Sequence, residues 1–186
     1  MNQLRIIAGL WRGRKIRFPD HEGLRPTADR IRETLFNWLQ ADIAGAHCLD
    51  LFAGSGALSF EAASRGAHCV VCVESDAAVS ACIRENLQNL SQAQIELIQQ
   101  DALEFLCSVK LAHKMDIVFL DPPFAADLLA QSCQLLEKHA WLNRRALIYL
   151  ESAEPLEELK LPENWRLIRS KKAGQVYYGL CQRQES

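Results

Sequence analysis

Short apolar runs alternate with segments of helical period from residue 48 onward. Runs of four to eight residues rich in Val, Ile, Leu and aromatic side chains are typical of buried strands. The expected strands are Cys48–Phe52, His68–Val73, Ile95–Ile98, Met115–Leu120 and Ala146–Glu151, and the expected helices are Leu58–Arg65, Asp76–Leu90, Leu103–Lys110 and Asp127–His139. This alternation predicts an α/β fold, in which a parallel sheet is covered by helices on both faces.

The N-terminal segment departs from this alternation. Two short β-like runs, Leu4–Ala8 and Arg14–Phe18, flank a loop with glycine at both ends, which predicts a hairpin with Trp11 at its tip. A helix follows, with apolar residues at positions 31, 35, 38 and 39, and Thr27 is a candidate for its N-cap. We therefore expect an N-terminal arm and linker over residues 1–26.

The C-terminal segment also departs from the alternation. The runs Trp165–Ser170 and Gln175–Cys181 are separated by too few residues for a crossover helix, so we expect these two strands to pair antiparallel. Residues 27–186 are then one domain that follows the arm. With 186 residues and 49% hydrophobic content, the chain can bury a sizeable core.

The composition indicates the cellular compartment of the protein and the state of its cysteines. No window is long and apolar enough to cross a membrane, and the N-terminus lacks the long apolar region of a secretory signal, so we expect a cytoplasmic protein. The seven cysteines are scattered, mostly inside apolar runs, which favours reduced core thiols. Cys69 and Cys72 fall in one strand-like run without a second Cys or His pair at zinc spacing, so no metal site is expected.

Charge is distributed unevenly along the chain. Residues 1–32 carry eight Lys or Arg against three Asp or Glu, whereas the net charge of the whole chain is −2. A basic segment on an otherwise acidic protein indicates a polyanion partner. A second basic cluster lies between Trp165 and Gln184, where no acidic residue occurs. The alternative is an ordinary solvated surface, and this alternative is favoured more strongly for the C-terminal cluster than for the arm.

A glycine-containing loop, Asp50-Leu-Phe-Ala-Gly-Ser-Gly56, follows the first expected strand of the sheet and precedes a helix. Open α/β sheets bind ligands at this place. No Gly-Lys-Ser/Thr follows, which excludes a phosphate-binding P-loop, and Ser59 breaks the dinucleotide pattern. The Asp50 carboxylate suits a cation such as the ammonium of S-adenosylmethionine. The alternative is a purely structural role, in which Asp50 caps the glycine turn.

Two further acidic residues follow the next strands. Glu74 is placed where a carboxylate accepts both hydroxyls of an adenosine ribose, although NAD would be served equally well. Asp101 and Ala102 are candidates for contact with the adenine amino group, and an ordinary helix N-cap is an equal alternative for Asp101. The candidate cofactor residues are Asp50, Phe52, Ala53, Gly54, Ser55, Gly56, Glu74, Asp101 and Ala102.

Asp121-Pro122-Pro123-Phe124 directly follows the apolar run that ends at Leu120. Pro123 lacks a backbone N–H and restricts Pro122 to extended conformations, so the carbonyl groups here are rigidly aimed. The Asp121 carboxylate and the Pro122 carbonyl can each accept one N–H of an amino group on a ring, while Phe124 stacks on that ring. The alternative is a Pro-Pro turn that merely ends a strand.

These motifs, in this order and on these strand ends, resemble the class I S-adenosylmethionine-dependent methyltransferases. The arginine-rich blocks Arg5–Gly9, Arg12-Gly13 and Arg25–Glu33 resemble the bacterial RsmD family of 16S rRNA guanine-N2 methyltransferases, over almost the whole chain. The resemblance implies a Rossmann-like sheet of seven strands and methyl transfer to one guanine of the small ribosomal subunit or of an assembly intermediate. Separately from the resemblance, we expect a monomer without a metal ion.

In this interpretation the arm binds RNA, with arginines on phosphates and Trp11 stacked on a base. The expected RNA contacts are Arg5, Trp11, Arg12, Arg14, Lys15, Arg17 and Arg25. Three alternatives stay open at this point. They are an adenine-N6 or other amino-group nucleic-acid methyltransferase, an NAD-linked oxidoreductase, and a non-catalytic RNA-binding module that retains the fold.

Overall fold

A computed structural model describes residues 1–20, 28–90, 94–110, 112–123 and 126–184. The strands are β1 (Asn2–Arg5), β2 (Lys15–Phe18), β3 (His47–Asp50), β4 (Cys69–Glu74), β5 (Ile95–Gln99), β6 (Met115–Leu120), β7 (Leu142–Ser152), β8 (Trp165–Ala173) and β9 (Val176–Arg183). The helices are α1 (Asp29–Trp38), α2 (Ala57–Ser64), α3 (Ala77–Gln88), α4 (Ala102–Ser108), α5 (Ala126–Lys138) and the short 3-10 helix η1 (Leu156–Glu158). Most of these elements lie within a few residues of the expected ones.

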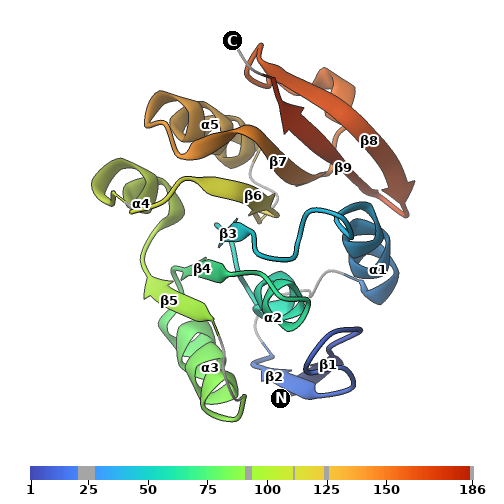
Figure 1. The fold of residues 1–186 in the computed structure, drawn as a ribbon, viewed down its shortest axis with the longest axis vertical. Coiled ribbons are helices and arrows are strands. Elements are labelled where there is room, and N and C mark those ends of the chain that lie inside the picture. The colour runs from blue at the N-terminus through green and yellow to red at the C-terminus, as the bar shows by residue number, and fades with distance from the viewer. Residues whose placement is uncertain (21–27, 91–93, 111, 124–125, 185–186) are drawn as a thin grey trace.

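The strands of the domain form one sheet of seven strands in the order β5-β4-β3-β6-β7-β9-β8 (Figure 1). Neighbouring strands from β5 to β7 are parallel, whereas β9 is antiparallel to both β7 and β8. The expected fold class is therefore confirmed, including the antiparallel last strand. Strand order reverses between β3 and β6, and ligands of open α/β sheets bind beyond the carboxyl ends of the strands at such a point.

Helices cover both faces of the sheet. Side chains of successive strand residues point to opposite faces, so each central strand contributes to two separate apolar clusters. On one face, Leu35 and Phe36 of α1 pack with Phe119 and Tyr149 of the central strands. On the other face, a separate cluster joins α4 and α5 to alternate residues of the same strands, among them Phe105, Leu136, Val118 and Leu150.

The N-terminal hairpin packs against the helices rather than adding to the large sheet. Strands β1 and β2 pair antiparallel in a two-stranded sheet. Its apolar residues Ile6 and Trp11 join Phe60 of α2 and Ile83 of α3 in a third buried cluster. Figure 1 shows the hairpin beside α2, at the side of the molecule remote from β8.

Two local boundaries differ from the sequence-based expectation. Strand β1 ends at Arg5 instead of continuing to Ala8, because the N–H groups of Ile7 and Ala8 donate to the Glu61 carboxylate of α2 and not to the partner strand. Helix α1 begins at Asp29 with Ala28 as its N-cap residue and without a side-chain cap bond. The proposed N-cap Thr27 lies outside the described residues.

All seven cysteines are free thiols. Five of them are buried, in agreement with the interpretation of core thiols, while Cys69 is half-buried and Cys107 is exposed. Among the described residues, no group of three or more His, Cys, Asp or Glu side chains is arranged to hold a metal ion. Within the same residues, none of the helices has the length and apolar character needed to span a membrane.

Candidate active site

Three carboxylates lie at the carboxyl edge of the sheet, around the point where strand order reverses. Asp50 ends β3, Glu74 ends the neighbouring strand β4, and Asp121 follows β6 on the other side of β3. The pKa of Asp50 is raised to about 7, chiefly by burial and also by the negative charges of Asp121 and Glu74, which together outweigh the hydrogen bonds from Ser59. The three predicted site carboxylates therefore share one electrostatic environment.

Asp50 is anchored by the first turn of α2. The side chain is 2% exposed, and its Oδ2 accepts hydrogen bonds from the Ser59 backbone N–H at 3.1 Å and from the Ser59 hydroxyl at 2.7 Å. Asp50 thus has the capping role considered as its structural alternative, although the bonded group is Ser59 of α2. Because a carboxylate offers about four acceptor sites, this cap is compatible with a cationic ligand as well.

The glycine loop is tied to strand β4 through its backbone. The Ala53 N–H donates to the Val73 carbonyl at 2.9 Å, and the Gly54 N–H donates to Oε2 of Glu74 at 2.8 Å. Gly56, the N-cap residue of α2, has φ of +75°, and a Cβ there would lie 2.8 Å from the Phe60 ring. The loop therefore requires glycine at this position and is fixed relative to Glu74.

Glu74 is half-buried, and both of its carboxylate oxygens accept backbone N–H groups. In addition to the bond from Gly54, Oε1 accepts from the Asp76 N–H at 2.8 Å. Burial raises the pKa of Glu74 above its ordinary value. The carboxylate is thus held in one orientation at the end of β4, beside the glycine loop, with lone pairs remaining for two hydroxyl groups.

Asp76 and Asp101 are N-cap residues. Asp76 accepts hydrogen bonds from the N–H groups of Ala78 and Val79 and is the N-cap residue of α3. Asp101 accepts from the N–H groups of Leu103 and Glu104 at the start of α4, while its neighbour Ala102 is buried. The cap alternative is confirmed for Asp101, and its contact with adenine stays a prediction.

Asp121 is half-buried, Pro122 is buried and Pro123 is exposed, directly after the end of β6. Phe124 lies outside the described residues. The segment leaves the sheet at the switch point, next to the glycine loop that follows β3. The structure thus brings Asp121 and Pro122 to the same edge as the proposed cofactor residues.

A buried pair beside Asp121 was not singled out in the sequence. The Tyr149 hydroxyl donates to Oε1 of Glu151 at 2.6 Å, and both side chains are buried. The last register pair of β6 and β7 is Leu120 with Leu150, so Asp121 and Glu151 follow on adjacent strands. Burial and the Glu151 charge raise the pKa of Tyr149, and Asp121 adds to this effect. The Tyr-x-Glu spacing at the end of the expected strand is the signal that would have indicated the pair.

The candidate RNA contacts on the arm divide into two groups. Arg5, Arg12, Arg14, Lys15 and Arg17 are all exposed, as a phosphate-binding surface requires, and Arg25 lies outside the described residues. Trp11 is only 3% exposed, so the expectation that it stacks on an RNA base is wrong for this conformation. Its side chain instead fills the apolar cluster between the arm and α2.

The arm is fastened to the last turn of α2. The Ser64 hydroxyl donates to the Ala8 carbonyl at 2.6 Å and accepts from the Trp11 N–H at 3.0 Å, and the Leu10 N–H donates to the Ser64 carbonyl at 2.7 Å. This close approach requires Gly9, because a Cβ at that position would lie 1.9 Å from the Ser64 carbonyl oxygen. The chain reversal at Gly9 is therefore what turns Trp11 inward.

A buried ionic cluster joins α1, α2 and the arm. The Glu61 carboxylate is fully buried and accepts from the N–H groups of Ile7 at 2.8 Å and Ala8 at 3.0 Å and from Nε of Arg65 at 2.7 Å. Arg32 is also fully buried, with Nη1 3.8 Å from Glu61 and Nη2 donating to the Arg5 carbonyl at 3.0 Å. Each charge also has a partner close by in the chain, Asp29 at 2.7 Å for Arg32 and Arg65 at 2.7 Å for Glu61, so the cluster combines local ion pairs with contacts between the elements.

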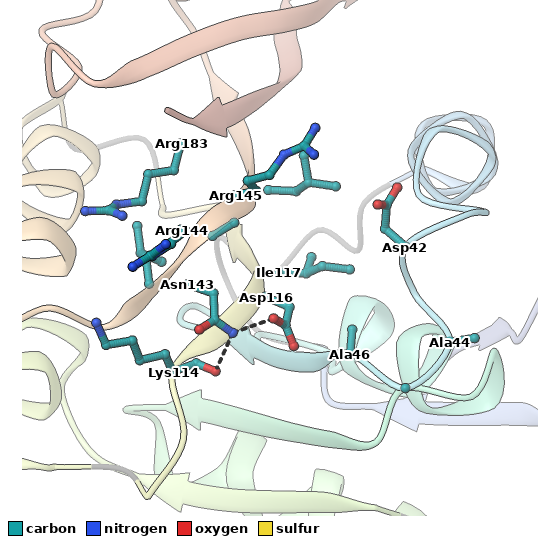
Figure 2. Close-up of a pocket in the computed structure, with 14 residues that line it drawn as sticks. Asp42, Ala44, Ala46, Lys114, Asp116, Ile117, Asn143, Arg144, Arg145 and Arg183 are labelled. Carbon is teal, nitrogen blue, oxygen red and sulfur yellow. Dashed lines mark hydrogen bonds between the residues drawn. The ribbon is translucent and has the colours of Figure 1, made fainter. Parts of the chain in front are cut away.

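A pocket of about 720 Å³ lies at the opposite edge of the sheet from the three carboxylates. Its wall includes Asp116 at the start of β6 and Asn143, Arg144 and Arg145 near the start of β7 (Figure 2). Figure 2 shows the Arg144 and Arg145 side chains pointing in different directions rather than toward one common point. This pocket is separate from the site defined by Asp50, Glu74 and Asp121.

Comparison with known proteins agrees with this site. The family model described as "Conserved hypothetical protein 95" matches residues 4–182. The "Ribosomal RNA small subunit methyltransferase D" proteins of Escherichia coli (strain K12) and Haemophilus influenzae are each 50% identical to this chain over 182 residues, covering 98% and 97% of it and 91% and 94% of their own lengths. The solved structure "Putative methyltransferase yhhF from Escherichia coli" is 48% identical, covers 100% of both chains and has a TM-score of 0.89.

The seven-stranded sheet with an antiparallel β9 and a carboxylate at the end of each of β3 and β4 has the architecture of a class I methyltransferase. The chain belongs to the family that the "Conserved hypothetical protein 95" model defines, which includes the methyltransferase D proteins of both bacteria. The resemblance to the RsmD family is therefore confirmed, and this chain is a methyltransferase.

Proposed function

We propose that this protein transfers one methyl group from S-adenosylmethionine to the exocyclic N2 of a guanine in 16S rRNA. The substrate is the small ribosomal subunit or an assembly intermediate, and the protein acts as a monomer in the cytoplasm. The arm of residues 1–26 holds RNA, and residues 27–186 carry the chemistry. The observation that supports the proposal best is the placement of Asp121 and Pro122 at the switch point, beside Asp50 and Glu74.

The residues at the carboxyl edge fit S-adenosylmethionine by their chemistry. Asp50 is a buried carboxylate suited to the ammonium group, and Glu74 is oriented by two backbone N–H groups to accept the ribose hydroxyls. Phe52, Ala53, Gly54, Ser55 and Gly56 form the loop between them, and Asp101 and Ala102 lie at the end of the next strand. When bound, this cofactor supplies an electrophilic methyl group.

The task of the protein is then to position a poor nucleophile. The lone pair of a guanine amino group is delocalised into the ring, and acceptors for both of its N–H bonds favour the geometry in which that lone pair is localised. In the proposal the Asp121 carboxylate and the Pro122 carbonyl are these acceptors, and Asp121 also takes the proton that is released. Phe124 provides a stacking surface for the unstacked base. Alignment of this kind is a major source of rate enhancement.

Glu74→Ala is expected to weaken cofactor binding by about 1–3 kcal/mol, because a ligand hydroxyl loses a charged acceptor and the Gly54 N–H loses its partner. Titration calorimetry with S-adenosylmethionine measures the change. Glu96→Ala removes an exposed carboxylate from the neighbouring strand β5 and serves as the control. An unchanged dissociation constant in Glu74→Ala would remove Glu74 from the site.

Cofactor affinity is expected to decrease as the pH falls below about 7. The pKa of Asp50 is raised to about 7 in the free protein, and an ammonium ligand stabilises the ionised carboxylate and lowers that pKa. Binding is therefore accompanied by proton loss, and the dissociation constant should increase by up to about tenfold per pH unit below 7. Asp50→Asn should abolish this dependence. The idea fails if the wild-type constant is the same at pH 5.5 and 7.5.

Methyl incorporation tests the function itself. Small subunits and naked 16S rRNA from a strain that lacks the enzyme are incubated with methyl-labelled S-adenosylmethionine, and the digested RNA is analysed by mass spectrometry. One N2-methylguanosine supports the proposal, and a methyl group on adenine N6 supports the first alternative. RNA binding without methyl transfer would favour a non-catalytic module. Binding of NADH in place of S-adenosylmethionine would favour an oxidoreductase.

A further inference from the structure

The edge strand β8 carries a row of exposed cations. Arg166, Arg169, Lys171 and Lys172 are all exposed, and the chain contains no acidic residue from position 165 to 184. Strand β8 lies at the end of the sheet opposite to β5 and pairs only with β9. A concentration of positive charge on a chain with a net charge of −2 calls for a functional explanation.

A β-bulge directs three of these cations to one face. The register of β8 on β9 shifts between Leu167 and Arg169, so that Ile168 is an extra residue. Leu167 pairs with Cys181 and packs with the cluster on the α4 and α5 side, which turns the preceding Arg166 to the α1 side.

After the bulge, Arg169 and Lys171 also point to the α1 side. They pair with Leu180 and Tyr178, two residues of the cluster under α1. Residues 166 and 169, three positions apart, would face opposite sides of a regular strand. The bulge therefore aligns Arg166, Arg169 and Lys171 along the same face of the edge strand.

An aromatic pair connects this row to α1. Trp38, the last residue of α1, stacks on Tyr178 of β9 with ring centroids 5.7 Å apart and an interplanar angle of 24°. Nζ of Lys171 lies 5.9 Å from the centroid of the Trp38 ring. Trp38 is half-buried, and Figure 1 shows the end of β8 beside α1. We define Arg166, Arg169, Lys171 and Trp38 as the β8 surface.

Paired strand residues connect the end of β8 with the candidate active site. Lys171 pairs with Tyr178, Tyr178 pairs with Glu151, and Glu151 follows the Leu150–Leu120 pair beside Asp121. A row of paired residues at the carboxyl edge thus leads from Asp121 to Lys171, the cation of the β8 surface that lies nearest to the end of the strand. The arm lies at the other side of the molecule, against α2 and α3.

We propose that the β8 surface is a second docking surface for the RNA substrate, where the cations bind backbone phosphates of the strand that flanks the target nucleotide. This inference rests on the proposed function. RNA is favoured as the occupant because the surface combines aligned cations with an aromatic ring, and because it continues the row of residues from Asp121. With the arm on one side and β8 on the other, the RNA is held on both sides of the reacting base.

The test compares two double variants with the same change in charge. Arg169→Ala/Lys171→Ala removes two cations of the β8 surface. Arg144→Ala/Arg145→Ala removes two exposed cations near the start of β7, at the wall of the pocket in Figure 2. Binding of fluorophore-labelled small subunits, and of a labelled full-length 16S rRNA transcript, is measured against salt concentration. Loss of two phosphate contacts should reduce the salt slope by about 1.4–1.8 in the β8 variant only. The KM for small subunits should rise at least about tenfold. The turnover number kcat and the cofactor affinity should be unchanged, because contacts that bind the ground state and the transition state equally affect KM alone.

Each outcome decides between the two proposals. A slope and KM equal to those of the control variant overturn the β8 surface while leaving methyl transfer intact. A wild-type protein that binds the transcript through β8 but transfers no methyl group supports the surface and overturns the proposed function. Absence of wild-type binding to both the small subunits and the transcript overturns both. Thermal unfolding of both variants verifies that the exposed substitutions leave the fold unchanged.

Discussion

Asp121→Ala is expected to lower the turnover number by about 10²–10³, the effect of deleting one preorganised polar contact at a reacting group. Asp121 is half-buried at the end of β6, where strand order reverses, and it shares its electrostatic environment with Asp50. Its removal takes away the acceptor for one N–H bond and for the released proton. The measurement is single-turnover methyl transfer at saturating RNA and cofactor.

The strand that carries Asp121 also provides the control. Asp116, at the opposite end of β6, accepts hydrogen bonds from the His47 N–H and the Asn143 side chain at the edge remote from the site. Asp116→Asn changes the charge of the same strand and should leave kcat within about twofold of wild type. Cofactor affinity should be unchanged in both variants, because Asp121 acts on the nucleophile. Turnover of Asp121→Ala near the wild-type value would contradict the assigned role.

Glu61→Ala should lower the free energy of unfolding by about 3–5 kcal/mol, because it removes the buried carboxylate beside the Arg32 guanidinium, which then keeps only the exposed Asp29 carboxylate at 2.7 Å. The backbone N–H groups of Ile7 and Ala8 lose their acceptor in the same variant. Urea denaturation measures the change. Trypsin should also cleave the arm after Arg12 or Arg14 faster than in the wild-type protein, since the arm loses a main attachment to α2.

Two comparisons separate the contribution of the Arg32–Glu61 pair to stability from the other effects of the substitution. Glu85→Ala removes an exposed carboxylate from α3 and should change stability by no more than about 0.5 kcal/mol. Arg32→Leu should cost less in the Glu61→Ala background than in the wild-type protein, because the charge that has lost its buried partner is then removed. If the two substitutions are additive, Arg32 and Glu61 are not coupled and the prediction is wrong.

The central strands of the sheet were predictable because they are buried on both faces. Met115–Leu120 is confirmed at both ends, as expected for a run that is apolar apart from Asp116 and is bounded by polar residues. The start of β7 was missed, because Asn143, Arg144 and Arg145 are polar residues at the wall of the pocket in Figure 2 and interrupt the apolar pattern. A strand that extends beyond the covering helices carries no hydrophobic signal there.

The candidate site was predictable to the extent that strand order places strand ends together. Asp50, Glu74 and Asp121 each end or follow a strand, so the fold alone brings them to one edge. The bond of Asp50 to Ser59 and the pair of Tyr149 and Glu151 depend on side-chain contacts, which the order of strands does not specify.

The arm shows the limit of local patterns. Trp11 lies between two glycines in a basic segment, a context typical of an exposed loop tip. Its burial depends on Ser64, whose hydroxyl accepts the Trp11 N–H across a separation of 53 residues. A contact over such a separation leaves no signal in the neighbouring sequence, so the inward turn of the loop emerged only from the tertiary structure.

The anchoring of the arm on α2 also has a consequence for biosynthesis. The hairpin is made first, yet Glu61 follows Ile7 by 54 residues, so a nascent chain exposes Leu4, Ile6 and Trp11 until α2 has been translated. At about 5–20 residues per second this interval lasts several seconds, during which those apolar side chains lack their packing partners. Chaperone contact during translation should therefore be concentrated on the first twenty residues.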